Sequence, residues 1–225
     1  MTSALAAGVV QEVLGTAEGL AALLTEAVVP QDVTITEVSG HVLERLSDVR
    51  TSQGIVAVAT SQTGDLDAVV GTGLLVVLDA VADPGNAGTI VRTADAAGAA
   101  GVILTEGSVD VFGPKAVRSA AGSTYHLPIV VDVPFGAVVD RCRTAGQSIY
   151  GLAGAGSRTI DDLEGQAPPI ALVLGNEAHG LSTAHAELLD GLVSIPIHGR
   201  AESFNVAAAA AIAIYLTARS TRSRA

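Results

Sequence analysis

The sequence predicts an α/β protein with a mostly parallel sheet and helices on both of its faces. Of the 225 residues, 49% are hydrophobic and 16% are charged, which suits a large buried core and excludes extended disorder. After residue 73, short β-rich runs alternate regularly with segments of helical composition. The runs at 74–78 and 170–174 are apolar on both faces, which is typical of parallel strands covered by helices on both sides.

Six β-rich runs are the expected strands of this sheet. They lie at residues 74–79, 101–105, 127–131, 148–153, 170–175 and 192–196. An uncharged stretch at 203–218 follows the last run and is too short and too polar to span a bilayer, so we expect a buried helix there. Ligands of parallel sheets bind beyond the carboxyl ends of the strands, so the loops after Asp79, Leu174 and Pro196 are the places to look for chemistry.

Charge and turn residues divide the chain into two expected domains. Residues 1–67 hold nine acids against two arginines, a net charge of −7, and leave −4 of the total of −11 for the remainder. A polar, turn-rich stretch near residues 60–72 indicates a linker. We therefore expect a small domain with its linker at 1–67 and a larger α/β domain at 68–225.

Composition also excludes several classes of protein. The single Cys142 cannot form an internal disulfide or a cysteine-based zinc site, and we expect no metal. No Lys or Arg precedes Arg45, so the basic region of a secretory signal is missing, and we expect a cytoplasmic protein without membrane contacts. The net charge of −11 disfavours a large nonspecific nucleic-acid footprint.

Several familiar sequence signatures are absent. There is no Walker phosphate loop, HExxH pair or nucleophile elbow. The nearest dinucleotide-binding candidate, residues 154–159, lacks the third glycine, which disfavours a nicotinamide-dependent oxidoreductase.

The first informative segment is DPGNAGTIVRTAD at residues 83–95, where a Pro-Gly turn leads into a helix expected to begin near Asn86. Asn86 and Arg92 are six residues apart, so both can lie on one broad side of that helix. The alternative is that Asn86 only caps the helix and that Arg92 is a solvated charge.

The second segment is LGNEAHGLS at residues 174–182, in which Gly175 and Gly180 lie on either side of Glu177. Glycine permits close approach of the backbone to a ligand. The alternative is a tight turn in which Glu177 is solvated; in either case Ser182 is expected to cap the next helix.

The third segment joins SIPI at 194–197 to SFNV at 203–206, where the last helix starts. Its polar candidates are Ser203 and Asn205. The alternative makes Ser203 the helix cap and leaves Asn205 without a role. Three such segments in order, each at the carboxyl end of a strand, favour a functional site.

Together these segments resemble the three motifs of the SpoU/TrmH-type RNA ribose 2'-O-methyltransferases, of the SPOUT superfamily, over about residues 70–219. The resemblance implies a C-terminal trefoil knot, S-adenosylmethionine as methyl donor, a homodimer, and an RNA substrate, with ribosomal RNA favoured over transfer RNA. A noncatalytic RNA-binding or assembly protein on the same fold is the alternative.

The resemblance also implies roles for particular residues. The catalytic set is Asn86, Arg92, Glu177, Ser203 and Asn205. The cofactor-binding set is Leu152, Ala153, Gly154, Leu174, Gly175, Asn176, Gly180, Ile195, Ile197 and Phe204. RNA is expected to contact Lys115 and Arg118. Arginine stays protonated in proteins, so Arg92 is expected to hold a phosphate or stabilise alkoxide charge rather than act as a base.

Residues 14–58 are similar to the second half of the small α/β RNA-binding domain that many members of the family carry. The first strand and helix of that domain have no room before Gly15. We therefore expect a partial RNA-substrate-binding domain within residues 1–67, from a chain that is truncated or whose start is placed late.

Overall fold

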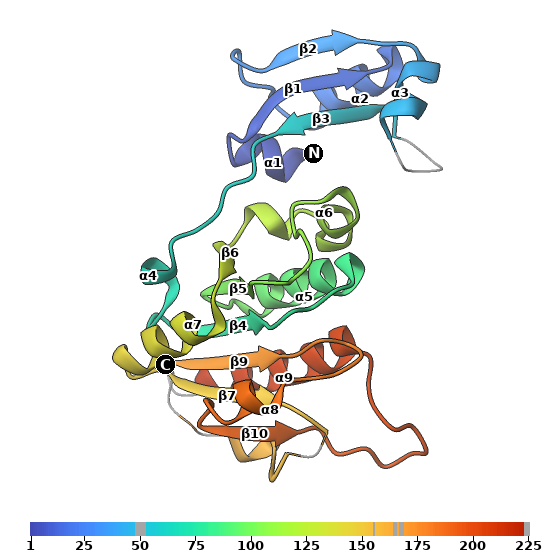
Figure 1. Cartoon of the computed structure of the whole chain (residues 1–225). Coiled ribbons are helices and arrows are strands. Elements are labelled where there is room, and N and C mark those ends of the chain that lie inside the picture. The colour runs from blue at the N-terminus through green and yellow to red at the C-terminus, as the bar shows by residue number, and fades with distance from the viewer. Residues whose placement is uncertain (48–52, 155, 164–165, 167–168, 223–225) are drawn as a thin grey trace. The chain divides into compact units, whose positions relative to one another are not determined.

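The computed structural model describes residues 1–47, 53–154, 156–163, 166 and 169–222. The chain forms two compact units, Met1–Gln62 and Thr63–Ala225 (Figure 1). The first unit has a three-stranded sheet of order β2-β1-β3, in which β2 is parallel and β3 antiparallel to β1. Its elements are α1 (Thr2–Ala6), β1 (Val10–Gly15), α2 (Ala17–Glu26), β2 (Thr34–Glu37), α3 (Gly40–Leu46) and β3 (Ile55–Ala59).

The second unit contains a seven-stranded sheet of order β6-β5-β4-β9-β7-β10-β8, in which every pair of neighbours is parallel. Its strands are β4 (Leu74–Leu78), β5 (Gly101–Thr105), β6 (Ile129–Val133), β7 (Ser148–Leu152), β8 (Arg158–Thr159), β9 (Ile170–Leu174) and β10 (Gly191–Ser194). The predicted parallel sheet is confirmed. Two strands are displaced from their expected ranges, because Pro128 and Pro196, which lack a backbone N–H, lie just outside the ladder.

Helices cover both faces of this sheet, as predicted. Those of the second unit are α4 (Leu66–Val69), α5 (Pro84–Ala97), α6 (Pro114–Ala120), η1 (Ser123–Tyr125), α7 (Phe135–Thr144), η2 (Ile160–Leu163), α8 (Thr183–Ala186) and α9 (Val206–Arg222). Leu74, Val76 and Leu78 pack with buried residues of α5 and α9. Leu75 and Val77, on the opposite face of β4, pack with α7.

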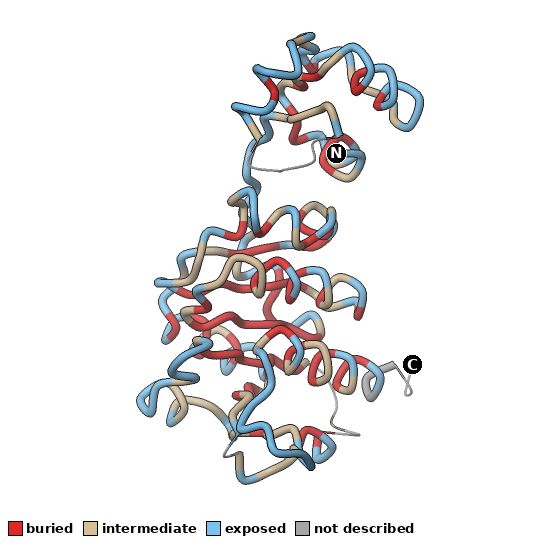
Figure 2. The backbone as a smooth tube through the Cα atoms, turned by 90° about the vertical axis from the view of Figure 1, so that its right-hand side faces the viewer, coloured by how far each residue is buried: buried red, intermediate tan, exposed pale blue. Residues whose placement is uncertain are grey.

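The central strands β4 and β9 are buried along their whole length (Figure 2). Leu and Val at consecutive positions are therefore removed from water on both faces, which is the main favourable contribution to the stability of this unit. Because all neighbours are parallel, the carboxyl ends of β4, β9, β7 and β10 lie along one edge of the sheet. The loops that follow them are thereby brought together.

Candidate active site

The loop after β4 leads directly into α5, and the capping chemistry fixes where that helix begins. The Asp83 carboxylate accepts a hydrogen bond from the backbone N–H of Asn86 at 2.9 Å, and Pro84 occupies the first helical position. The helix ends at Gly98 in a left-handed conformation. Asn86 therefore lies inside the first turn, and its interpretation as the helix cap is wrong.

Glu177, in the loop after β9, accepts three hydrogen bonds from the region around Asp83. Its carboxylate accepts from the backbone N–H of Ala82 at 2.9 Å, from that of Asp83 at 3.0 Å and from Asn86 Nδ2 at 3.0 Å. Glu177 is exposed, but it is not merely a solvated side chain. It holds the β4–α5 loop to the β9–α8 loop.

Asn205 extends this network to the last helix. Its Nδ2 donates to Asn86 Oδ1 at 3.2 Å, while its Oδ1 accepts from the backbone N–H groups of Ala207 at 2.9 Å and Ala208 at 3.3 Å. Asn205, not Ser203, thus caps α9, so the alternative for this segment is wrong. We call Asn86, Glu177 and Asn205 the amide–carboxylate network; Asn86 is 91 residues before Glu177 and 119 residues before Asn205 in the chain.

Electrostatics keep the acids of this region ionised. Partial burial raises the pKa of Glu177, but the hydrogen bonds from Asn86, Ala82 and Asp83 outweigh it and hold that pKa below its usual value. The Lys115 ammonium, 2.8 Å from Asp83, and the backbone N–H of Asn86 lower the pKa of Asp83. A carboxylate in this state is a strong acceptor and a weak base.

Arg92 and Ser203 lie outside the amide–carboxylate network. Arg92 is exposed on α5, and within the described part of the chain it has no hydrogen-bond or ion-pair partner. Ser203 is exposed just before α9 and lines the cavity described next. Three of the five predicted catalytic residues, Asn86, Glu177 and Asn205, therefore contact one another directly, and the catalytic roles of all five remain predictions.

A cavity of about 320 Å³, which we call the cofactor cavity, adjoins the network at the carboxyl ends of β7, β9 and β10. All ten residues of the predicted cofactor-binding set line it: Leu152, Ala153, Gly154, Leu174, Gly175, Asn176, Gly180, Ile195, Ile197 and Phe204. The sequence reasoning missed Ala178, Glu202, Val206 and Ala209 as lining residues. The last two are three residues apart at the start of α9, a helical spacing that could have found them.

The cavity combines apolar side chains with two carboxylates. Leucine, isoleucine and phenylalanine side chains suit a flat aromatic base, whereas Glu177 and Glu202 suit a cationic ligand. Asn176 and Gly180, which both line the cavity, exchange two backbone hydrogen bonds of 3.1 and 2.8 Å, which fixes the loop between them. An S-adenosylmethionine-sized molecule, with an adenine and a positive charge, fits this lining.

A second, open hollow of about 730 Å³ lies over the amide–carboxylate network. Its lining residues are Ala82, Asp83, Asn86, Asn176, Glu177, Ala178 and Asn205. It shares Asn176, Glu177 and Ala178 with the cofactor cavity. A molecule in the hollow would therefore meet a ligand of the cavity across these shared residues.

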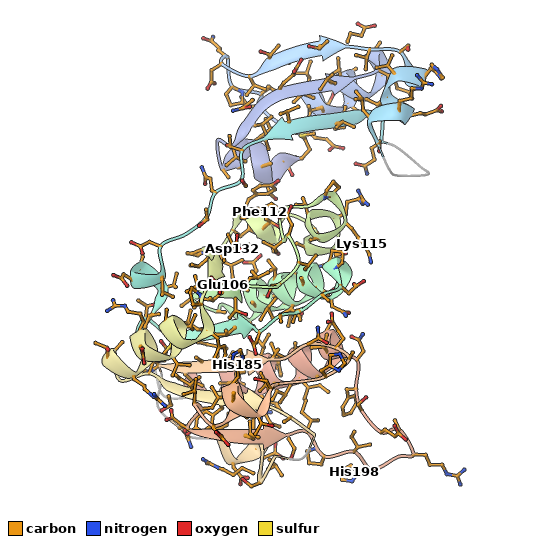
Figure 3. The ribbon with its side chains drawn as sticks, in the orientation of Figure 1. Glu106, Phe112, Lys115, Asp132, His185 and His198 are labelled. Carbon is orange, nitrogen blue, oxygen red and sulfur yellow. The ribbon has the colours of Figure 1, made fainter. Side chains whose placement is uncertain are left out.

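The α6 helix carries both predicted RNA-contact residues on its exposed side. Lys115, labelled in Figure 3, forms the ion pair with Asp83, and Arg118 lies one turn further on. A Cβ on Gly88 would lie 2.2 Å from the carbonyl oxygen of Ala116, so this glycine is what allows α6 to pack closely on α5. The close packing brings Lys115 beside Asp83, which caps the helix that carries Asn86.

Other kinds of site are not evident in the ranges that the structure describes. No group of three or more His, Cys, Asp or Glu residues there could hold a metal ion. None of the described helices combines the length and apolar character needed to cross a membrane.

Comparison with known proteins places this site in a family. Residues 73–215 match the SpoU rRNA Methylase family. The chain is 42% identical over 142 residues to the 23S rRNA (guanosine(2553)-2'-O)-methyltransferase RlmP of Bacillus subtilis, covering 63% of this chain and 56% of that one. It is 41% identical over 172 residues to a 23S rRNA (uridine(2479)-2'-O)-methyltransferase of Streptomyces viridochromogenes, covering 73% and 60%.

A solved structure shows the same fold over nearly the whole chain. The SpoU methyltransferase AviRb from Streptomyces viridochromogenes, in complex with the cofactor AdoMet, superposes with a TM-score of 0.83 at 33% identity, covering 96% of this chain and 85% of that one. The present chain thus spans less than two thirds of the two sequence relatives but most of the solved structure. On the matched motifs, the parallel sheet and this similarity, the chain belongs to the SpoU rRNA methylase family.

Proposed function

We propose that this protein is an S-adenosylmethionine-dependent RNA methyltransferase that methylates the 2'-hydroxyl of a ribose. The observation that carries the proposal is the shared wall of Asn176, Glu177 and Ala178 between the cofactor cavity and the open hollow. Methyl transfer requires donor and acceptor to meet in line, and much of its barrier can be lowered by such orientation. The named relatives act on 23S rRNA, which favours ribosomal RNA over transfer RNA as the substrate.

In this proposal the cavity residues bind the cofactor, which supplies a methyl group activated by a positively charged sulfur. Leu152, Ile195 and Phe204 would pack against the adenine, and the carboxylates of Glu177 and Glu202 would favour the positive charge. The ribose would occupy the hollow over Asn86 and Asn205.

The predicted catalytic residues, inside and outside the network, would have separate tasks. Both oxygens of Glu177 already accept hydrogen bonds, and its pKa is lowered, so it positions Asn86 rather than taking the proton of the hydroxyl. Arg92 is unpaired among the described residues and would hold a neighbouring phosphate or stabilise charge on the ribose oxygen. Ser203 would orient the ribose from the start of α9.

The proposal extends to the remaining parts of the molecule. Lys115 and Arg118 would contact RNA, and residues 1–67 would form a substrate-binding domain with its linker, preceding a catalytic domain at 68–225. We further propose a trefoil knot at the C-terminal end of the catalytic domain, a cytoplasmic location and a homodimer. Light scattering should then give about twice the chain mass of 22.4 kDa, whereas a monomer at micromolar concentration would contradict the dimer.

The second candidate is a noncatalytic RNA-binding or assembly protein on the same fold, and the net charge of −11 counts against nonspecific RNA binding by either candidate. Two experiments separate the candidates. Calorimetry should show about one S-adenosylmethionine per chain, because all ten predicted lining residues border one cavity. Radiolabelled methyl transfer to total RNA from cells lacking the gene should then map to a single ribose. Cofactor binding without methyl transfer to any RNA would support the second candidate.

A further inference from the structure

A buried carboxylate that lines neither the cofactor cavity nor the open hollow forms a hydrogen-bonded pair with a histidine. Asp79, directly after β4, is only 5% exposed. Its Oδ2 lies 2.7 Å from His185 Nδ1 on α8, and its Oδ1 accepts a hydrogen bond from Thr105 Oγ1 at 3.0 Å. The ring of His185 stacks on Phe135 with 4.1 Å between centroids and 10° between planes. Figure 3 labels His185 beside β9.

This pair is connected by hydrogen bonds to the residues of the proposed active site. Thr105 Oγ1 also accepts from the backbone N–H of Ala80 at 3.2 Å. The carbonyl oxygen of Ala80 in turn accepts from Asn176 Nδ2 at 2.8 Å, and Asn176 precedes Glu177. Asp79 and His185 thus lie at one end of a chain of contacts whose other end holds the network.

The backbone at Ala80 requires such support. Its φ of 54° is in the left-handed region, which an alanine adopts only when its surroundings impose it. Two residues later, the N–H groups of Ala82 and Asp83 reach Glu177. The conformation at Ala80 therefore decides where these two donors lie.

We propose that Asp79 and His185 are positioning residues that fix the β4–α5 loop against the β9–α8 loop and thereby place Glu177 and Asn86 for catalysis. This inference rests on the proposed function and adds two residues that the sequence motifs did not single out. Asp79 and His185 do not activate Thr105 as a nucleophile, because the Thr105 hydroxyl donates its hydrogen bond to Asp79 and not to the imidazole. Neither Asp79 nor His185 lines the cofactor cavity or the open hollow.

Two substitutions at one position separate the hydrogen bond from the stacking. His185→Phe keeps an aromatic ring on Phe135 but removes the donor to Asp79. His185→Asn keeps an amide donor near the position of Nδ1 and removes the ring. His126→Phe is the matched control, because His126 Nδ1 and Asp95 Oδ2 form a similar 2.8 Å pair that the β4–α5 and β9–α8 loops do not include.

We expect His185→Phe to lower the rate of methyl transfer at saturating RNA and cofactor by roughly ten- to a hundredfold, since small displacements of positioned groups have effects of this size. Its Kd for S-adenosylmethionine should stay within about threefold, because the β4–α5 loop, which the variant is expected to displace, does not line the cofactor cavity. His185→Asn should recover most of the rate, and His126→Phe should retain it. A His185→Phe enzyme with wild-type turnover, or one changed only in thermal stability, would overturn the proposal.

Amide hydrogen exchange tests the same inference without an activity measurement. In the chain free of cofactor and RNA, the amides of Ala80, Ala82 and Asp83 should exchange at least about tenfold faster in His185→Phe than in wild type, with no change in His126→Phe. Unchanged exchange overturns the positioning role. Faster exchange in a protein whose wild type methylates no RNA supports the role and contradicts only the proposed function. Should His185→Phe not fold, Thr105→Val, which removes the hydroxyl between Asp79 and Ala80, is measured with the same expectation.

Discussion

The amide–carboxylate network and the cofactor cavity share a wall but are built in different ways. The network depends on directional hydrogen bonds between the side chains of Asn86, Glu177 and Asn205 and nearby backbone groups. The cavity depends on shape, with apolar side chains and the backbone of the Gly175–Gly180 loop forming its lining. Substitutions in the network should therefore change turnover, and substitutions in the cavity should change cofactor affinity.

The largest expected effect is at Arg92, which lies on α5 six residues after Asn86 and outside the network. Because Arg92 is exposed and unpaired among the described residues, Arg92→Ala should leave stability unchanged. If the guanidinium stabilises charge that develops in the transition state, methylation should fall by roughly a hundredfold or more, with little change in cofactor Kd. Arg92→Lys should not fully restore the rate, because lysine lacks the planar fork. Near-normal single-turnover methylation by Arg92→Ala would show that Arg92 is only a solvated charge.

Gly154 offers the complementary test in the cavity. A Cβ at this position meets open space, and the residue lines the cavity, so Gly154→Val adds side-chain atoms where the cofactor is expected to bind. We expect Kd for S-adenosylmethionine to rise by roughly tenfold or more, with the rate at saturating cofactor close to wild type. Calorimetry measures the first quantity and single-turnover assays the second.

Gly136→Val is the control for this prediction. A Cβ on Gly136 also meets open space, but the residue lies on α7, away from the cavity. The Gly136→Val variant should have the same Kd for S-adenosylmethionine as wild type. Equal affinity in both variants would mean that Gly154 does not border the bound cofactor.

A smaller effect is expected at Asn205, where one substitution separates two functions. Asn205→Asp retains an oxygen that can cap α9 but loses the Nδ2 donor to Asn86 Oδ1. Turnover should fall by about tenfold while the melting temperature stays near wild type. Asn205→Ala loses the cap as well, which costs about 1 kcal/mol of stability. If Asn205→Asp retained full turnover, the link to Asn86 would have no catalytic role.

Local patterns in the sequence are sufficient to predict the parallel sheet. Strands β4 and β9 are runs of Leu, Val, Ile and Ala whose two apolar faces require burial, and the structure buries all of their residues. Ser182, which was expected to cap the helix after Glu177, does accept a hydrogen bond from the backbone N–H of His185 at 3.1 Å. Such features are determined by neighbours in the chain, so they can be read from it.

Contacts between distant segments could not be predicted in this way. Gly175 was expected to allow a ligand close to the backbone, but its Cβ would lie 2.4 Å from the carbonyl carbon of Gly180, so the glycine first allows the loop to fold on itself. Asp79 and His185 are 106 residues apart, and neither carries a local signal of the other. Only the order of the parallel strands brings them together.

The smallest effect we predict is the dependence of stability on the ionisation of Glu177. Its pKa in the folded chain is held below the ordinary value of 4.5, so the ionised carboxylate adds stability above about that pH, and this contribution is lost as the pH falls through the lowered pKa. Wild type should therefore exceed Glu177→Gln in urea-unfolding midpoint at about pH 7, and the gap should narrow below about pH 4.5. Glu202→Gln is the control, since this carboxylate lines the same cavity but has no hydrogen-bond partner in the described ranges. The difference in urea-unfolding midpoint between wild type and Glu202→Gln should stay small at every pH tested. If the difference in urea-unfolding midpoint between wild type and Glu177→Gln stayed constant down to about pH 3, the three donors would not act on an ionised carboxylate.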